Sequence, residues 1–266
     1  MKRVVVCFFG VISRSIRYTF ESIKSNIIDV LKDNDYEVEI YVFNLNIKDT
    51  KIDNIIIDQS DISLIPYNYF EEEYQSKIDN EIECLKKQTQ ILFTRSDYTD
   101  CVVQNCLRQL YSEYRVGLFL ERNVTNYDLS IVCGPDFYIA NKLNLDELEC
   151  SYKNNCFYTT LANDAQGYTN GFYFGRPDIL IKPLKRLEYI SYFMPVHRDY
   201  EYILQESLRL NNLSRGITSL MFFKVRANKS VFFRDRNSVY IRFFSNAMFN
   251  LILCEYNALI DRLSRL

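Results

Sequence analysis

Residues 10–17 contain side chains suited to binding phosphate, since a glycine and two arginines directly follow an apolar run. Ligands of open α/β sheets bind at the carboxyl ends of the strands, where the amino terminus of the next helix attracts anions. Gly10 allows close approach of the backbone, and Arg14 can form a forked contact with a diphosphate. The alternative for Arg14 is a surface arginine in the first turn of a helix. The segment lacks the glycine patterns of a dinucleotide fingerprint and of a P-loop.

A second group of polar residues has helical spacing. Asn105, Arg108, Gln109 and Ser112 fall on one stripe of a predicted helix. Such a stripe is usually a solvated face, but this helix leads into a buried strand that ends at residues 134–136. Asp136, at the tip of that strand, can hold a divalent cation, Mn²⁺ or Mg²⁺, that bridges a diphosphate. Turns also favour proline and aspartate, so an ordinary turn is the alternative.

Residues 163–175 hold three glycines at four-residue spacing among amide side chains. Amides beside glycines suit sugar hydroxyls, because the backbone can approach a ring closely and the amides bond without adding charge. Asp164 can act there as a general base for an attacking hydroxyl. The alternative is an Asx-turn in which Asp164 only caps the loop.

His197 is the only histidine of the chain. Without a second histidine, a multi-histidine metal site and most Ser-His or Cys-His triads have little room. An exposed structural histidine is the simplest interpretation of His197. A metal ligand late in the chain is the alternative.

The composition is that of an ordinary globular protein, with 48% hydrophobic and 25% charged residues among 266. The 32 Lys and Arg nearly balance the 34 Asp and Glu, so no overall positive field would hold a nucleic acid. Eight cysteines without metal-ligand spacing predict reduced thiols. The apolar start lacks a small-residue cleavage site, and no run approaches the roughly 20 apolar residues of a membrane span. We therefore expect a cytoplasmic protein with no nucleic-acid partner and no membrane span.

The elements that would position these residues begin with a βαβ unit. Residues 4–9 form a continuous apolar run, which is typical of a parallel strand covered on both faces. Apolar residues then recur at helical spacing over 16–31, and residues 37–45 predict a second strand. Such a unit favours a parallel sheet with right-handed crossovers.

The rest of the chain continues the alternation of helices and strands. We expect a charged, exposed helix over 71–88, a helix over 98–120, strands over 128–133, 157–161 and 168–174, and a helix that opens at Pro177. A helix after residue 198, a strand over 217–225, a basic and aromatic stretch over 229–244 and a final amphipathic helix to residue 266 follow. No repeat or linker divides them, so a single α/β domain is predicted.

The order of these motifs resembles that of the GT-A-like glycosyltransferases found in large DNA viruses and microbial polysaccharide clusters. The resemblance is carried by Gly10 with Ser13-Arg14, residues 108–112, Tyr127-Asp128 with Pro135-Asp136, Asn163-Asp164 with residues 168–172, and residues 222–227. Together these motifs cover most of the chain. Each is short, and the specificity lies in their order and spacing.

The resemblance implies a single Rossmann-like GT-A domain over residues 1–266. Residues 1–140 would form the half that binds a nucleoside diphosphate sugar, and residues 141–266 the acceptor half with a helical C-terminal extension. Gly10, Arg14, Asn105, Arg108 and Gln109 would bind the donor, and Asn170 with Gly171 would line the acceptor side of the site. Asp136, with His197 as a late ligand, would hold the metal. The family's Asp-x-Asp is reduced here to one carboxylate. For the late carboxylate that inverting members of the family use as a base, the resemblance leaves Glu201 and Glu206, in the helix after His197, as candidates alongside Asp164.

Three hypotheses follow from these patterns. The first is transfer of a hexosyl or pentosyl group from a nucleoside diphosphate sugar to a hydroxyl of a glycan or small molecule. A base would assist the attack on the anomeric carbon, while arginines or a metal stabilise the leaving diphosphate. The second is a non-catalytic carbohydrate-binding or scaffold protein with a degenerate GT-A fold. The third, a nucleotidyltransferase, ranks last because the chain lacks a glycine-rich basic loop.

Overall fold

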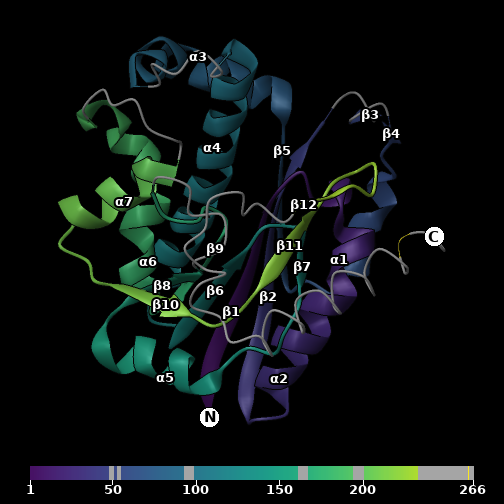
Figure 1. Cartoon of the computed structure of the whole chain (residues 1–266), viewed down its shortest axis with the longest axis vertical. Helices are drawn as coiled ribbons and strands as arrows, with labels where there is room; N and C mark the ends of the chain where they lie inside the picture. Colours follow the sequence, from purple (N-terminus) through teal and green to yellow (C-terminus); the bar gives the residue numbers. More distant parts are fainter. Residues whose placement is uncertain are drawn as a thin grey trace, which may run out of the picture.

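A seven-stranded sheet forms the centre of the computed structural model, which describes residues 1–47, 51–52, 55–92, 99–160, 167–193, 201–232 and 263. In chain order its strands are β1 (Lys2–Gly10), β2 (Tyr36–Asn46), β5 (Tyr69–Tyr74), β6 (Leu129–Cys133), β8 (Phe157–Thr160), β9 (Phe172–Gly175) and β10 (Arg215–Thr218). The spatial order is β10-β8-β9-β6-β1-β2-β5 (Figure 1). β9 is antiparallel to both neighbours and all other adjacent strands are parallel, which confirms the predicted mostly parallel α/β sheet.

Strand β1 is central to the fold because both of its faces are buried. Val4, Val6 and Phe8 belong to the hydrophobic core on one face of the sheet. Val5, Cys7 and Phe9 belong to the core on the other face. Successive side chains of a strand point to opposite faces, so a continuous apolar run needs cover on both. β1 pairs in parallel with β2 and β6, so the carboxyl ends of these three strands lie at one edge of the sheet.

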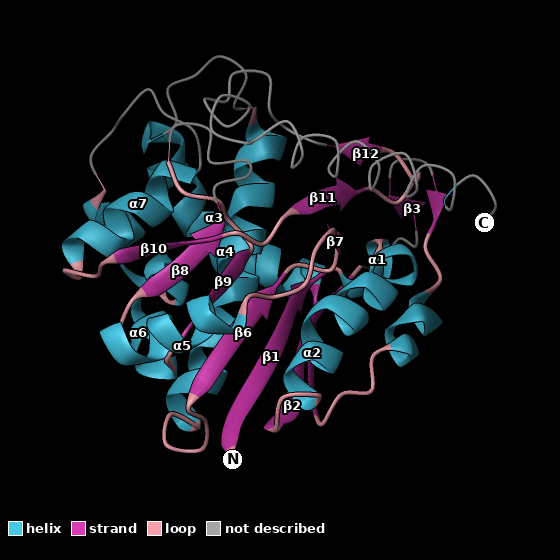
Figure 2. Ribbon diagram, turned by 60° about the horizontal axis from the view of Figure 1, so that its bottom comes forward, coloured by secondary structure: helices cyan, strands magenta, loops and turns pink. Residues whose placement is uncertain are grey.

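Helices supply this cover on both faces (Figure 2). On the face that contains Val4, α1 (Ile16–Ile23), the π-helical segment η2 (Lys24–Ile28) and α2 (Asp29–Lys32) follow one another directly, and α5 (Leu145–Asn154) joins the same core. On the other face lie α3 (Gln75–Leu92), α4 (Asp100–Arg122), α6 (Pro177–Leu184), η4 (Arg186–Tyr192) and α7 (Glu201–Leu210). The predicted βαβ unit and the helix that opens at Pro177 are both confirmed.

A smaller antiparallel sheet follows the carboxyl end of β6. Its order is β12-β11-β7, and its strands are β7 (Phe137–Ile139), β11 (Phe222–Val225) and β12 (Val231–Phe232). Phe137 stacks on Phe222 with ring centroids 4.1 Å apart. The Val225 amide donates to the Asp136 carbonyl at 2.8 Å, so β11 is attached to the residue that directly precedes β7. The 3-10 turns η1 (Ile12–Arg14) and η3 (Gln59–Leu64) and the hairpin of β3 (Lys51–Ile52) and β4 (Ile55–Ile56) complete the described elements.

The helix expected over 71–88 begins later, because residues up to Tyr74 form the edge strand β5. Acidic side chains of this strand have partners on either side. Glu71 pairs with Arg115 of α4 at 2.7 Å, while Glu72 accepts a hydrogen bond from Asn44 of β2 at 2.6 Å. The consecutive acidic residues that indicate an exposed helix in the sequence are here held by a neighbouring helix and strand.

The single strand expected over 217–225 is divided between the two sheets. β10 ends at Thr218, and β11 begins at Phe222. Glu147 of α5 accepts a hydrogen bond from the Thr218 hydroxyl at 2.5 Å and one from the Ser219 amide at 3.0 Å. These contacts hold the chain where it leaves the large sheet, so β11 can continue in the smaller one.

Other expectations meet the structure in part. The strand predicted over 168–174 is confined to Phe172–Gly175. The described cysteines are free, and no helix among the described residues combines the length and apolar character needed to cross a bilayer. The stretch expected over 229–244 is described only to residue 232, where β12 ends. Of the final helix expected to residue 266, only Leu263 is among the described residues. The division into halves 1–140 and 141–266 stays a prediction.

Candidate functional site

A cavity of about 1050 Å³ opens where β1, β2 and β6 end. Phe9 and Gly10 line it from β1, Leu45 from β2, and Gly134 from the turn after β6. This is the edge at which open parallel sheets bind their ligands. The cavity brings together the following residues predicted from the sequence: Gly10, Arg14, Asn105, Arg108, Gln109, Asp136, Asn170 and Gly171.

Asp136 lies at the centre of a group of positive charges. Arg14 Nη2 donates to its Oδ2 at 2.5 Å, and Arg226 Nη1 is 3.5 Å from the same oxygen. Burial alone would raise the pKa of Asp136, but the charges of Arg14, Lys224 and Arg226 outweigh it, so the pKa lies below its ordinary value. Asp136 is therefore an ionised carboxylate within what we call the cationic cluster, Arg14, Lys224 and Arg226.

The smaller sheet positions two members of the cationic cluster. Lys224 lies in β11, where it pairs with Phe137 of β7, and its Nζ is 5.4 Å from the centroid of the Phe137 ring. Arg226 follows two residues later, and both side chains line the cavity. Burial lowers the pKa of Lys224, an effect that the negative charges of Asp136 and Glu201 offset only in part.

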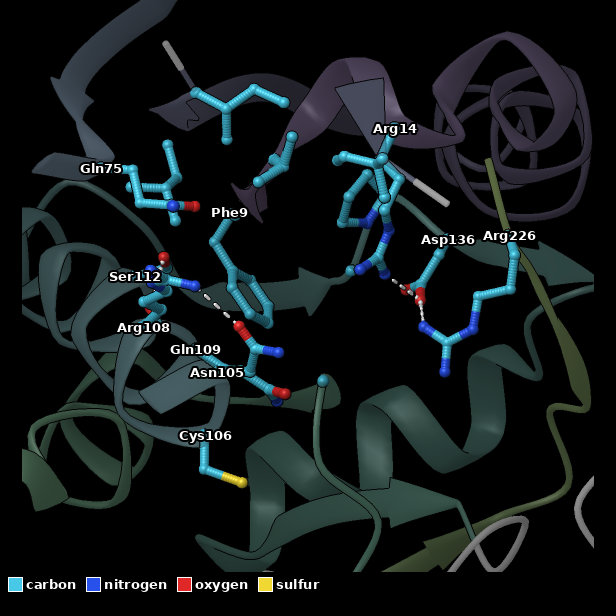
Figure 3. Close-up of a pocket in the computed structure, with 18 of the residues that line it drawn as sticks. Phe9, Arg14, Gln75, Asn105, Cys106, Arg108, Gln109, Ser112, Asp136 and Arg226 are labelled. Atoms are coloured by element: carbon cyan, nitrogen blue, oxygen red, sulfur yellow. Dashed lines mark hydrogen bonds and ion pairs between the residues drawn. The ribbon is translucent and has the colours of Figure 1, made fainter. Parts of the chain in front are cut away.

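Helix α4 lines the cavity with its predicted polar stripe. Arg108 makes a two-point contact with Asp79 of α3, with both nitrogen–oxygen distances at 2.7 Å, and its third nitrogen donates to Asn105 at 2.8 Å. The charge of Arg108 is therefore compensated by Asp79. Figure 3 shows Arg14, Asp136 and Arg226 on one side of Phe9, with Arg108 and Ser112 on the other. We call the neutral side chains Asn105, Gln109 and Asn170 the amide side of the cavity.

Gly171 joins the cavity to the end of β6. Its φ of +98° belongs to the region that side-chain-bearing residues rarely adopt, and an added Cβ would lie 3.0 Å from the Phe137 ring. The carbonyl of Gly171 accepts a hydrogen bond from the Gly134 amide at 2.8 Å. This backbone contact places the buried side chain of Asn170 at the cavity wall.

The candidate bases fall in different places. Asp164 and the metal candidate His197 lie outside the described residues. Glu201 is the first residue of α7. Its negative charge opposes the lowering of the Lys224 pKa, and it adds to the larger effect of burial in raising the pKa of Cys106. Lys224 and Cys106 both line the cavity. Glu206, five residues further along α7, pairs with Arg209 at 2.8 Å, and neither glutamate is among the residues that line the cavity.

The described residues do not fit a divalent cation. Such ions take several oxygen ligands, whereas Asp136 is a single carboxylate with cationic neighbours. No group of three or more His, Cys, Asp or Glu in the described part of the chain is placed to hold a metal ion. A Mn²⁺ or Mg²⁺ ion at Asp136 would have to compete with Arg14 and draw ligands from outside the described residues, where His197 lies.

The sequence matches no protein-family model and no curated protein. The fold is similar to those of solved glycosyltransferases. Mouse xyloside xylosyltransferase 1, in its apo form, aligns at a TM-score of 0.43 and 7% identity over 82% of this chain and 85% of that one. The mannosyltransferase Ktr4p from S. cerevisiae, in complex with GDP, aligns at a TM-score of 0.40 and 12% identity over 78% of this chain and 66% of that one. The likeness is one of chain arrangement.

The structure places Lys224, Arg226 and Asp79 in the cavity wall. Residues 222–227 contribute to the resemblance, but the sequence alone predicts no part in the site for these three side chains. A signal for the first two is present in the sequence. Lys224 and Arg226 are two residues apart, and alternate residues of a strand share a face. No comparable pattern marks Asp79, because its role depends on how α3 packs against α4.

Proposed function

We propose that this protein transfers a monosaccharide from a nucleoside diphosphate sugar to a hydroxyl acceptor. The observation that carries the proposal is the division of one cavity into a cationic cluster and a neutral amide side. A nucleotide sugar has the same division, because it joins a doubly charged diphosphate to a neutral ring of hydroxyl groups. A single ligand of this class would meet complementary groups on both sides.

The cationic cluster would bind the diphosphate. Three positive side chains face one carboxylate, so an excess of positive charge remains for an anionic ligand. Hydrogen bonds between cations and phosphate oxygens are short and strong, and they strengthen as negative charge develops on the leaving group. In this proposal Arg14, Lys224 and Arg226 supply the charge compensation that a divalent cation would otherwise provide. A metal held by Asp136 and His197 is the alternative.

The remaining wall suits the neutral parts of the donor. Val11, Ile47 and Ile52 line the cavity, and they pack in one apolar cluster that would accept the face of a nucleobase. The amide side would bind sugar hydroxyls, since an amide offers both a donor and an acceptor. The cavity volume of about 1050 Å³ has room for both.

The attacking hydroxyl needs a base. Among the described candidates Glu201 has the better position, because its charge acts on two residues of the cavity wall. It would accept the proton as the acceptor oxygen attacks the anomeric carbon, a role that contributes about 10²–10⁴ in rate. Asp164 is the competing candidate, and Glu206 would first have to leave Arg209.

Calorimetric titration with UDP and GDP tests the proposal directly. We expect binding of at least one of them in the presence of EDTA, with the corresponding nucleoside as the control that lacks phosphate. Binding only with Mn²⁺ would favour a metal site at Asp136. No binding of any nucleoside diphosphate, with or without Mn²⁺, would exclude a nucleoside diphosphate sugar as the donor. Tight binding without transfer or hydrolysis of any nucleotide sugar would favour the non-catalytic carbohydrate-binding alternative.

A further inference from the structure

A fully buried ion pair lies directly behind the amide side of the cavity. Glu113 of α4 and Arg186 of η4 have no exposed side-chain surface, and Arg186 Nη1 is 2.7 Å from Glu113 Oε2. A buried pair of this kind is weak support for stability, because desolvation of both charges offsets their attraction. Its presence therefore calls for another explanation.

The pair is bonded to groups that line the cavity. Gln109 Nε2 donates to Glu113 Oε1 at 2.9 Å, and the Tyr173 hydroxyl donates to Glu113 Oε2 at 3.1 Å. The same hydroxyl accepts a hydrogen bond from the Gly171 amide at 2.7 Å. Arg186 Nη2 donates to Asn170 Oδ1 at 3.2 Å. Through these contacts Gln109, Asn170 and Gly171 depend on one buried network.

The charges of the pair determine which way each amide faces. An ionised carboxylate only accepts hydrogen bonds, so Glu113 holds the amino end of Gln109 and turns its carbonyl oxygen away. A guanidinium only donates, so Arg186 holds the carbonyl oxygen of Asn170 and turns its amino end away. The amino nitrogen of Asn170, Nδ2, is buried with no hydrogen-bond partner in the described structure. A buried donor without a partner needs an explanation, and Asn170 lies at the cavity wall, where a ligand atom can supply the missing acceptor.

We propose that Glu113 and Arg186 are positioning residues for a sugar subsite, in which Asn170 Nδ2 donates to one hydroxyl and Gln109 Oε1 accepts from another. This inference rests on the proposed function and specifies that the sugar of the donor binds at the amide side. The subsite is neutral, so it selects a hydroxyl-bearing ring and not a second phosphate. Tyr173 ties the Gly171 backbone to the same network.

The test compares ligands that differ only in the sugar. Dissociation constants of UDP and GDP are measured against those of UDP-glucose, UDP-galactose and GDP-mannose. In the wild-type protein we expect at least one sugar to add affinity. Asn170→Ala should remove on the order of tenfold from the affinity for that nucleotide sugar and leave the affinity for its nucleoside diphosphate unchanged.

A second variant tests the positioning residues themselves. In Glu113→Leu with Arg186→Met, apolar side chains replace both charges, a change that folded proteins often tolerate. We expect it to lose the sugar-dependent part of the affinity in the same way as Asn170→Ala. Lys185→Met is the matched control and should keep the sugar-dependent affinity, because it removes the neighbouring charge that pairs with Glu121 of α4 and Glu188 of η4 and leaves the buried pair intact.

The outcomes separate the two proposals. Absence of nucleoside diphosphate binding in the wild-type protein would contradict the proposed function itself. If nucleoside diphosphates bind normally, two results would overturn the subsite alone. Either the sugar adds no affinity in the wild-type protein, or Asn170→Ala retains the affinity that the sugar adds. If the double variant does not fold, Asn170→Ala still decides, because Asn170 contacts the ligand and carries no charge.

Discussion

The side chains that pair with Asp136 are the same cations that a phosphate group would bind. Its Oδ2 accepts from Arg14 and lies near Arg226, and Lys224 contributes a third positive charge. Binding of a diphosphate would therefore exchange one anionic partner for another. In the ligand-free protein the Asp136 carboxylate offsets part of the repulsion among these partly buried cations.

Replacement of Asp136 by Asn should tighten the binding of UDP or GDP by about tenfold, or about 1.4 kcal/mol, because the amide no longer competes for the cations. It should also lower the melting temperature, since the cationic cluster loses its counter-charge. Calorimetry and thermal unfolding measure the two effects. Under the metal alternative the same change would abolish Mn²⁺-stimulated transfer, and EDTA would weaken binding to the wild type.

Loss of one arginine from the cationic cluster should have the opposite effect. Arg226→Ala or Arg14→Ala should weaken nucleoside diphosphate binding by about 1.5–3 kcal/mol, the range of hydrogen bonds to charged groups. Arg17→Ala is a suitable control, because Arg17 pairs with Asp58 and Asp61 and is not among the residues that line the cavity. A variant that lowers the melting temperature but leaves affinity unchanged would identify its arginine as structural.

Lys224 should give the proposed nucleoside diphosphate binding a pH dependence. Its pKa lies below the ordinary value of 10.5, chiefly because of burial, so it loses its proton at lower pH than an exposed lysine. An anionic ligand favours the protonated form, so binding takes up protons and affinity falls as the pH is raised through the lowered pKa. The Lys224→Arg variant should retain its affinity for nucleoside diphosphates to higher pH. Titrations in buffers of different ionisation enthalpy measure the uptake; equal uptake in both proteins would assign it to another group.

At the scale of elements, the start of α7 and the segment before β9 are packed backbone to backbone. A Cβ added to Gly167 would lie 2.1 Å from the carbonyl carbon of Glu201, and the Tyr168 amide donates to the Glu201 carbonyl at 3.0 Å. The position of the Glu201 side chain therefore depends on a glycine in another segment.

Gly167→Ala should displace the beginning of α7. We expect turnover to fall while nucleoside diphosphate affinity is retained, together with a melting temperature lower by about 2–4 °C per kcal/mol of lost stability. Glu201→Gln is the matched variant, since it should reduce turnover by about 10²–10⁴ with little change in stability. Equal losses of affinity and turnover in Gly167→Ala would show that this segment supports the donor instead.

The elements that could be predicted are those with a strong local pattern. The apolar run of β1 and the helical spacing of α1 follow directly from residue order. α5 was missed although Asn144 caps it and accepts hydrogen bonds from the amides of Asp146 and Glu147, a signature visible in the sequence. The break between β10 and β11 could not be predicted, because it depends on a long-range contact with Glu147.

At the scale of the whole molecule, one cavity draws on distant parts of the chain. Local spacing predicted Arg14 and the stripe on α4, because each lies within one element. It could not pair Glu113 with Arg186, or place Lys224 beside Asp136, because the packing of separate elements decides both. The predicted donor half, 1–140, therefore describes only part of the cationic cluster, since Lys224 and Arg226 lie beyond it.

The attachment of β11 to β7 also determines when the site can exist during synthesis. A ribosome releases the amino-terminal part of a chain first, so β1, β2, β5 and β6 are free to pair while residues 222–226 are still to be made. Until β11 emerges, Asp136 lacks Lys224 and Arg226, and the nascent chain has only Arg14 to offer an anionic ligand. The nucleotide would thus be unable to guide the early steps of folding and would stabilise only chains whose smaller sheet has already formed.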